Sequence, residues 1–265
     1  AFYFLRVGSY KVSGSLFAFS VGAKLSMVLA LPFPLIYLWK NTRLRANFNL
    51  FSKFLFSNIF LLVIIPAISV GYRQMVLGTP QAKNLFWFAL PIDQELNIFL
   101  LPVAFSILIY TMWRINRSNF SLLLSITGLS FLISILMMPP NPGWYLWALP
   151  FLIIYQVNAD LSGKIFVTLF SILVIYLLIP ITSNSDILFF EQTKFPNFEN
   201  QFPLLDSSIT FTIVVILGLI LSIRLFRDSI SKNDYFRLSN KSISIGISGS
   251  RKSGKKSLAN SLENI

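Results

Sequence analysis

A short segment near the C-terminus has the residue types and the spacing to bind phosphate groups. Residues 242–248 alternate as a β-strand does, residues 249–257 form a loop rich in glycine, serine and lysine, and residues 258–262 suit a helix start. A Walker A phosphate-binding loop requires this order of strand, loop and helix. Loop amides would surround the phosphates, and a lysine would reach the terminal pair. The segment therefore predicts an ATP site, with Mg²⁺, at Gly249, Ser250, Gly254, Lys255 and Ser257.

One position departs from this pattern. Lys256 stands where such a loop carries the hydroxyl that binds Mg²⁺, so the metal is poorly held unless Ser257 replaces that hydroxyl. The segment resembles the opening of uridine-kinase-like nucleoside kinases, whose loop reads G-x-x-x-x-G-K-T-T. Residues 242–265 would then be the start of a truncated α/β P-loop domain, because too few residues follow for its parallel sheet. The alternative is a basic, serine-rich tail near anionic lipid.

Lys24 is a second candidate, because it lies near the middle of an apolar stretch at residues 14–39. A lysine at the centre of a membrane costs about 2.5–3.5 kcal/mol, so something must compensate its charge. One interpretation is an anionic partner such as a lipid or sugar phosphate that enters between helices. The other is a side chain whose stem extends to the nearer membrane surface.

A proline-rich turn at residues 138–143 leads directly into Trp144 and Tyr145. Prolines at three of its positions remove amide donors and forbid helix, so a sharp turn is expected before the next apolar stretch. The two aromatic side chains would stack on a sugar ring or an isoprenoid tail. Alternatively, they belong to the aromatic belt that membrane proteins carry at both interfaces.

The composition indicates that most of the chain lies in lipid. Hydrophobic residues make up 55%, charged residues only 12%, and the mean hydropathy is +0.69. The absence of Cys and His excludes disulfides, thiolate metal sites and a Ser-His-Asp triad. The sequence therefore predicts no metal-binding residues. It does not tell whether the membrane domain uses a divalent metal. The net charge of +12 is not accompanied by a nucleic-acid-binding motif, so no nucleic-acid partner is expected.

Apolar stretches long enough to approach or cross a bilayer recur along the chain. They predict an all-α polytopic membrane helix bundle with about seven spans, at 14–39, 51–72, 97–113, 120–138, 144–158, 161–181 and 207–226. The first is either one long span or a hairpin of two half-helices that meet near Lys24. We favour the hairpin, because it returns Arg6 and Lys11 to the cytoplasmic side. The predicted domains are a membrane domain at 1–226, a basic cytoplasmic linker at 227–241 and the P-loop segment at 242–265.

The distribution of charge predicts the orientation of these spans. Basic residues concentrate in the connections 40–53, 114–117, 159–164 and 224–241, whereas most acidic residues lie in 73–96 and 182–206. Lys and Arg are retained on the cytoplasmic side, so the first set faces inward. We therefore expect a multi-pass integral membrane protein with a cytoplasmic C-terminus.

The lysine-bearing first stretch, its Leu31-Pro32, and the later turn at 139–150 together resemble the later membrane half of GT-C superfamily glycosyltransferases. The resemblance implies transfer of sugar from a polyprenyl-phosphate carrier at the outer face of the membrane. It implies Lys24, Trp144 and Tyr145 as contacts to the donor or its lipid phosphate. That family's catalytic acid lies in an earlier loop, so the catalytic residue is unknown, and Asp93 and Glu95 do not correspond to it.

The expected function is thus a membrane glycosyltransferase fused to a nucleotide-binding domain, with membrane lipid, a polyprenyl-phosphate sugar and a nucleotide as partners. Because the sequence opens on Ala1 and ends inside a P-loop segment, we expect a fragment of a longer protein. A multi-span transporter and a catalytically inactive membrane scaffold, each with a regulatory P-loop domain, are the alternatives.

Overall fold

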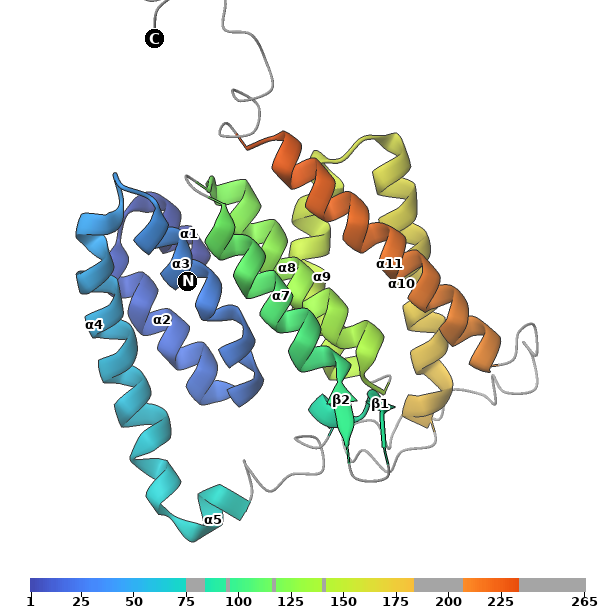
Figure 1. Cartoon of the computed structure of the whole chain (residues 1–265), viewed down its shortest axis with the longest axis horizontal. Helices are drawn as coiled ribbons and strands as arrows, with labels where there is room; N and C mark the ends of the chain where they lie inside the picture. Colours follow the sequence, from blue (N-terminus) through green and yellow to red (C-terminus); the bar gives the residue numbers. More distant parts are fainter. Residues whose placement is uncertain (75–83, 94–95, 116–117, 140–141, 184–206, 234–265) are drawn as a thin grey trace, which may run out of the picture.

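The computed structural model describes residues 1–74, 84–93, 96–115, 118–139, 142–183 and 207–233. The predicted P-loop segment, with all of its nucleotide-binding residues, lies outside this range. The described chain is a bundle made mostly of helices (Figure 1). The main helices are α1 (Phe2–Val7), α2 (Tyr10–Ala23), α3 (Pro32–Lys40), α4 (Phe48–Ile59), α5 (Val70–Tyr72), α7 (Leu100–Arg114), α8 (Phe120–Met137), α9 (Pro142–Asn158), α10 (Leu161–Ser183) and α11 (Ser207–Ser231).

Short irregular turns connect several of these helices. They are the 3₁₀ turns η1 (Leu25–Ala30), η2 (Arg45–Asn47), η4 (Pro66–Ile68) and η6 (Asn84–Phe86), and the π-helical turn η3 (Phe60–Ile64). Strands β1 (Ala89–Pro91) and β2 (Asn97–Phe99) pair antiparallel, with Ala89 opposite Phe99. The all-α prediction is therefore corrected at residues 97–99. The helix starts only at Leu100, because Pro102 fits the first turn, where an amide donor is not needed.

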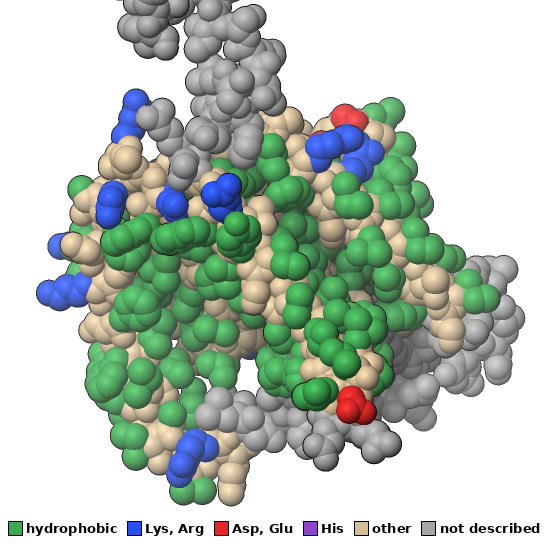
Figure 2. Space-filling model, viewed as in Figure 1, with side chains coloured by type: hydrophobic (Ala, Val, Ile, Leu, Met, Phe, Trp, Pro, Cys, Tyr) green, Lys and Arg blue, Asp and Glu red, His purple; other side chains and the backbone are tan. Residues whose placement is uncertain are grey.

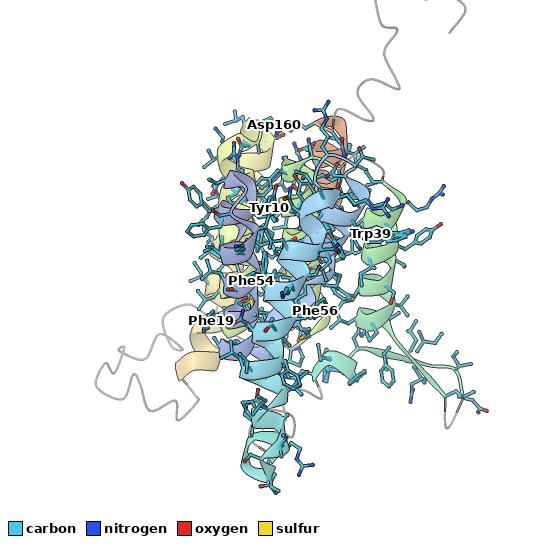
Figure 3. The ribbon with its side chains drawn as sticks, turned by 90° about the vertical axis from the view of Figure 1, so that its left-hand side faces the viewer. Tyr10, Phe19, Trp39, Phe54, Phe56 and Asp160 are labelled. Carbon is cyan, nitrogen blue, oxygen red and sulfur yellow. The ribbon has the colours of Figure 1, made fainter. Side chains whose placement is uncertain are left out.

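Within the described residues, four helical segments are long and apolar enough to cross a membrane: Arg45–Ile68, Phe120–Met137, Leu161–Leu178 and Ser208–Ser231. Many large apolar side chains face outward from the bundle, including Phe19 of α2 and Phe56 of α4 (Figure 3). Helices with such continuous apolar exposure need a lipid environment or further covering. The structure thus has the character of a helical membrane bundle.

Helix α8 is the centre of the larger part of the bundle. It packs against α7, α9 and α11, and it is buried on several sides, from Leu122 and Ile126 to Leu132. An apolar helix without a polar face suits such a central position. Hydroxyls of Thr127, Ser130 and Ser134 donate to carbonyls one turn earlier, which satisfies them inside the helix.

The first apolar stretch forms a hairpin. Helix α2 ends at Ala23, Lys24 is extended, with φ of −151° and ψ of 111°, and α3 returns in the opposite direction (Figure 1). Helix α1, which precedes the first arm, and the end of the second arm both lie beside the start of α8. The Arg6 guanidinium lies 5.8 Å from the centroid of the Phe120 ring, and Asn41 Nδ2 donates to Ser118 O at 2.8 Å. The hairpin that the charge distribution favoured is the arrangement that forms.

Most of the described cations gather at one end of the bundle, which we call the basic end (Figure 2). Here lie the last residues of α3, α7, α9 and α11 and the first residues of α8 and α10. Contacts between these helix ends define it: Lys232 Nζ donates to Asn158 O, and Asn119 Nδ2 donates to Lys232 O. The turn of the hairpin, α5 and the β1–β2 pair lie toward the opposite end (Figure 1).

Candidate functional site

Lys24 lies at the turn of the α2–α3 hairpin and not within a continuous helix. Its backbone amide donates to Ser20 O, and its own carbonyl accepts from Met27, so the extended residue is held on both sides. Its side chain is exposed. Lys24 Nζ lies 4.2 Å from the centroid of the Trp147 ring in α9. This is a cation–π contact, which holds an ammonium group without neutralising its charge.

Trp147 belongs to a small aromatic group on one face of α9. The Trp144 and Trp147 rings are edge to face, with centroids 4.6 Å apart, and Phe131 of α8 lies 6.1 Å from Trp147. Trp144 is only 8% exposed and packs with Leu101 and Met138. Its ring therefore supports Trp147 and is not itself open for stacking on a ligand.

Tyr145 lies on a different face of α9. Its ring is 6% exposed and joins the main apolar core, and its hydroxyl faces Ser171 of α10. Of the predicted donor-binding residues, the structure thus brings Lys24 and Trp144 close through Trp147, and it leaves Tyr145 apart. Trp147 had a readable signal in the sequence, because residues three apart in a helix share a face.

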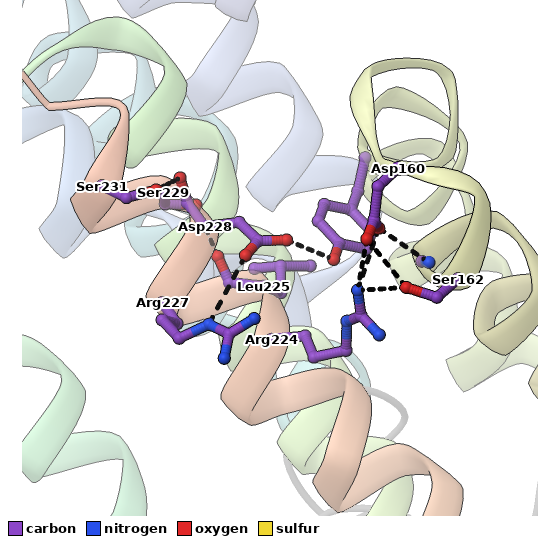
Figure 4. A network of polar contacts seen from close by, with 10 residues as sticks. Asp160, Ser162, Arg224, Leu225, Arg227, Asp228, Ser229 and Ser231 are labelled. Atoms are coloured by element: carbon purple, nitrogen blue, oxygen red, sulfur yellow. Dashed lines mark hydrogen bonds and ion pairs between the residues drawn. The ribbon is translucent and has the colours of Figure 1, made fainter.

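A polar network at the basic end was not recognised in the sequence (Figure 4). Arg224 of α11 donates through one nitrogen to both carboxylate oxygens of Asp160, at 2.9 and 3.0 Å, and to Ser162 Oγ at 2.7 Å. The side chain of Arg224 is 17% exposed and that of Asp160 is 61% exposed. The network joins the start of α10 to α11. In the sequence, the signal for this network was the position of Asp160 and Arg224 at the borders of apolar stretches.

Asp160 also caps α10. Its carboxylate accepts from the Gly163 amide at 2.9 Å and from the Ser162 hydroxyl at 2.7 Å, as an N-cap residue does. These two hydrogen bonds, and then the charge of Arg224, hold the pKa of Asp160 below its ordinary value. The carboxylate is therefore ionised at neutral pH and serves as a fixed partner for Arg224.

A second contact lies deeper in the same region. The Tyr155 hydroxyl donates to Asp228 at 2.8 Å, and Arg227 Nε lies 3.7 Å from the other oxygen of Asp228. Beside it, Tyr155, Asp228 and Lys232 line a cavity of about 40 Å³ between α8, α9 and α11. That volume accommodates about one water molecule. This cavity is small compared with a sugar or a nucleotide.

The described residues contain no group of three or more Asp or Glu side chains that could hold a metal ion. The predicted nucleotide-binding residues, from Gly249 to Ser257, lie outside the described residues, as does Glu95. Asp93 lies in the turn between β1 and β2. In the part of the chain that the structure describes, the exposed cation with an aromatic platform at Lys24 is therefore the better candidate for binding a ligand.

Comparison with known proteins gives no further guidance. No protein-family model, curated protein or solved structure matches this chain. The fold and the sites define its class only as a helical bundle, with four potential membrane-spanning helices in the part of the chain that the structure describes.

Proposed function

We propose that this chain is the later membrane portion of a GT-C-type glycosyltransferase that binds a polyprenyl-phosphate-linked sugar. The supporting observation is the position of Lys24, an exposed ammonium group held on Trp147 at the turn of a helical hairpin. Its nearest aromatic partner leaves its N–H donors available for a phosphate. In an apolar setting such a charge-assisted contact is stronger than in water.

In this proposal the basic end faces the cytoplasm and the Lys24 turn faces the outer half of the membrane. The asymmetry of charge between the two ends supports this orientation. The described chain leaves the bundle at the basic end, because Lys232 contacts Asn119 and Asn158 there. The segment that follows, with its P-loop pattern, would then lie in the cytoplasm, where nucleotides are available.

The experiment is a binding titration of the purified protein with a polyprenyl phosphate in detergent, followed by tryptophan fluorescence. Lys24→Met should weaken binding about tenfold, because it removes the cation while retaining a side chain of similar length. Lys24→Arg should retain most of the affinity. Lys11→Met is the matched control, since Lys11 lies in the first arm of the same hairpin and its Nζ is 5.9 Å from the centroid of the Phe54 ring, away from Trp147. Equal affinities of the Lys24→Met and Lys11→Met variants would refute the role of Lys24.

The segment 242–265 is proposed to bind ATP through its loop amides and Lys255. Lys255→Ala should lower ATP affinity about tenfold in titration calorimetry, whereas Lys252→Ala, within the same loop, should have little effect. Because Lys256 replaces a hydroxyl, Mg²⁺ should add little to affinity, and Lys256→Thr should restore a dependence on Mg²⁺. The absence of ATP binding by the unaltered chain would refute this site.

A further inference from the structure

The basic end is divided into two parts that balance charge differently. In the part formed by α9, α10 and α11, Asp160 and Asp228 lie 2.9 and 3.7 Å from Arg224 and Arg227. Among the described residues, the part formed by the ends of α3, α4 and α7 has no such ion pairs. Residues 1–92 and 96–159 contain no acidic residue. Within the described residues, these cations therefore form no ion pair.

Aromatic side chains hold two of these cations in place. Lys40 Nζ lies 4.4 Å from the centroid of the Trp113 ring, and Arg45 Cζ lies 4.4 Å from that of Trp39. The hydrogen bond from Asn41 to Ser118 O ties the α3–α4 connection to the α7–α8 connection, so the two pairs belong to one surface. We call this the cationic surface, and it comprises Trp39, Lys40, Arg43, Arg45, Trp113 and Arg114.

The cationic surface is accessible and lies at the border of an apolar one. Trp39 and Trp113 are 39% and 46% exposed, and the guanidinium groups at 43, 45 and 114 belong to exposed residues. Further along α7, Ile107 and Tyr110 are also largely exposed and form part of a shallow apolar groove. Figure 3 shows Trp39 below Asp160, at about the height of Tyr10, the first residue of α2. The cationic surface thus lies toward the end of the bundle at which α2 begins.

We infer that the cationic surface binds the headgroups of anionic phospholipids. Cations without an acidic partner among the described residues attract external anions, and tryptophan side chains favour the level of lipid headgroups. The neighbouring apolar face of α7 would contact acyl chains, which a soluble anion would not occupy. Lipid binding at the cationic surface does not involve Lys24, so it is independent of the proposed transferase function.

The test measures retained phospholipid by native mass spectrometry of the protein released from vesicles of equal phosphatidylglycerol and phosphatidylcholine. The unaltered protein should retain phosphatidylglycerol in preference to phosphatidylcholine. Each cation near an anionic surface contributes about a fivefold factor, so the double variant Lys40→Gln/Arg45→Gln should bind phosphatidylglycerol about 25-fold more weakly. Lys164→Gln/Arg227→Gln is the matched control, because it removes the same charge from the other part of the basic end.

Three outcomes would overturn the inference. The first is equal retention of the two lipids by the unaltered protein, a result that does not depend on how any variant folds. The second is an equal loss of phosphatidylglycerol in both double variants, which would indicate a general effect of net charge. The third is full displacement of the lipid by inorganic phosphate at constant ionic strength, which would indicate a site for free phosphate.

Discussion

Tyr155 donates a hydrogen bond of 2.8 Å to Asp228, and this bond joins α9 to α11 near the basic end. Asp228 is partly buried, with 25% of its side chain exposed. Hydrogen bonds such as the one from Tyr155 therefore offset the cost of removing its carboxylate from water. Helix α11 is the last element that the structure describes. The bond thus helps to fix the point from which the chain continues toward the predicted P-loop segment.

Tyr155→Phe should destabilise the folded protein by about 1 kcal/mol, because it removes a donor to a partly buried carboxylate. The measurement is unfolding in mixed detergent micelles, followed by circular dichroism. Tyr110→Phe is the control, since Tyr110 is 63% exposed. An equal effect of the two substitutions would contradict the importance of this bond.

Asp160 should make the folding stability of the protein depend on pH at low pH. Its folded-state pKa is lowered from 3.8, chiefly by the hydrogen bond from Ser162 and then by the Gly163 amide. When the pKa of a carboxyl group is lower in the folded protein than in the unfolded chain, its ionised form stabilises the fold. This stabilisation is fully present at a pH above the pKa of the unfolded chain, and it is lost as the pH falls through the pKa of the folded protein. Asp160→Asn should therefore lower the melting temperature slightly at pH 7, and the difference from the unaltered protein should shrink below pH 4.

The second variant separates the two roles of Asp160. Asparagine retains an oxygen that can accept from the Gly163 amide, so Asp160→Asn tests charge, whereas Asp160→Ala also removes the cap. Asp160→Ala should be the more destabilising at pH 7. If the effect of Asp160→Asn were independent of pH between 3 and 7, the lowered pKa would be contradicted.

Gly14 should not tolerate a larger residue. Helices α2 and α4 approach so closely here that a Cβ atom at position 14 would lie 2.6 Å from Phe51 O, a backbone atom that cannot move aside easily. Small residues permit such close approach of helices in membranes. Gly14→Ala should destabilise by about 1–3 kcal/mol in the same micelle titration. Gly71→Ala is the control, because its Cβ would meet only Ser69 Oγ, at 3.8 Å.

The orientation of the bundle can be tested by single cysteines, because the chain has none of its own. Thr42 is exposed at the basic end, and Asn97 is exposed in β2 at the opposite end. With a membrane-impermeant maleimide, Asn97→Cys should label in intact cells and Thr42→Cys only after permeabilisation. Labelling of both positions from the same side would contradict the proposed topology.

Much of the fold followed from local composition. The expected stretches at 120–138 and 161–181 correspond to α8 (Phe120–Met137) and α10 (Leu161–Ser183), and the helix predicted at 207–226 begins where α11 does. Apolar runs bounded by polar residues determine such helices, because each helix satisfies its own backbone hydrogen bonds. The charge distribution, read along the chain, also favoured the hairpin at Lys24.

Contacts between distant residues depended on the tertiary structure. Nothing in the sequence predicted that Lys24 would lie on Trp147, that Arg224 would bind Asp160, or that Tyr145 would turn away from both. Apolar helices of similar composition can pack in many orders, and the order is decided by close approaches such as that of Gly14 to Phe51. Composition therefore determined which segments are helical, whereas side-chain packing between helices determined which polar groups meet, because a single helix contains no information about its neighbours.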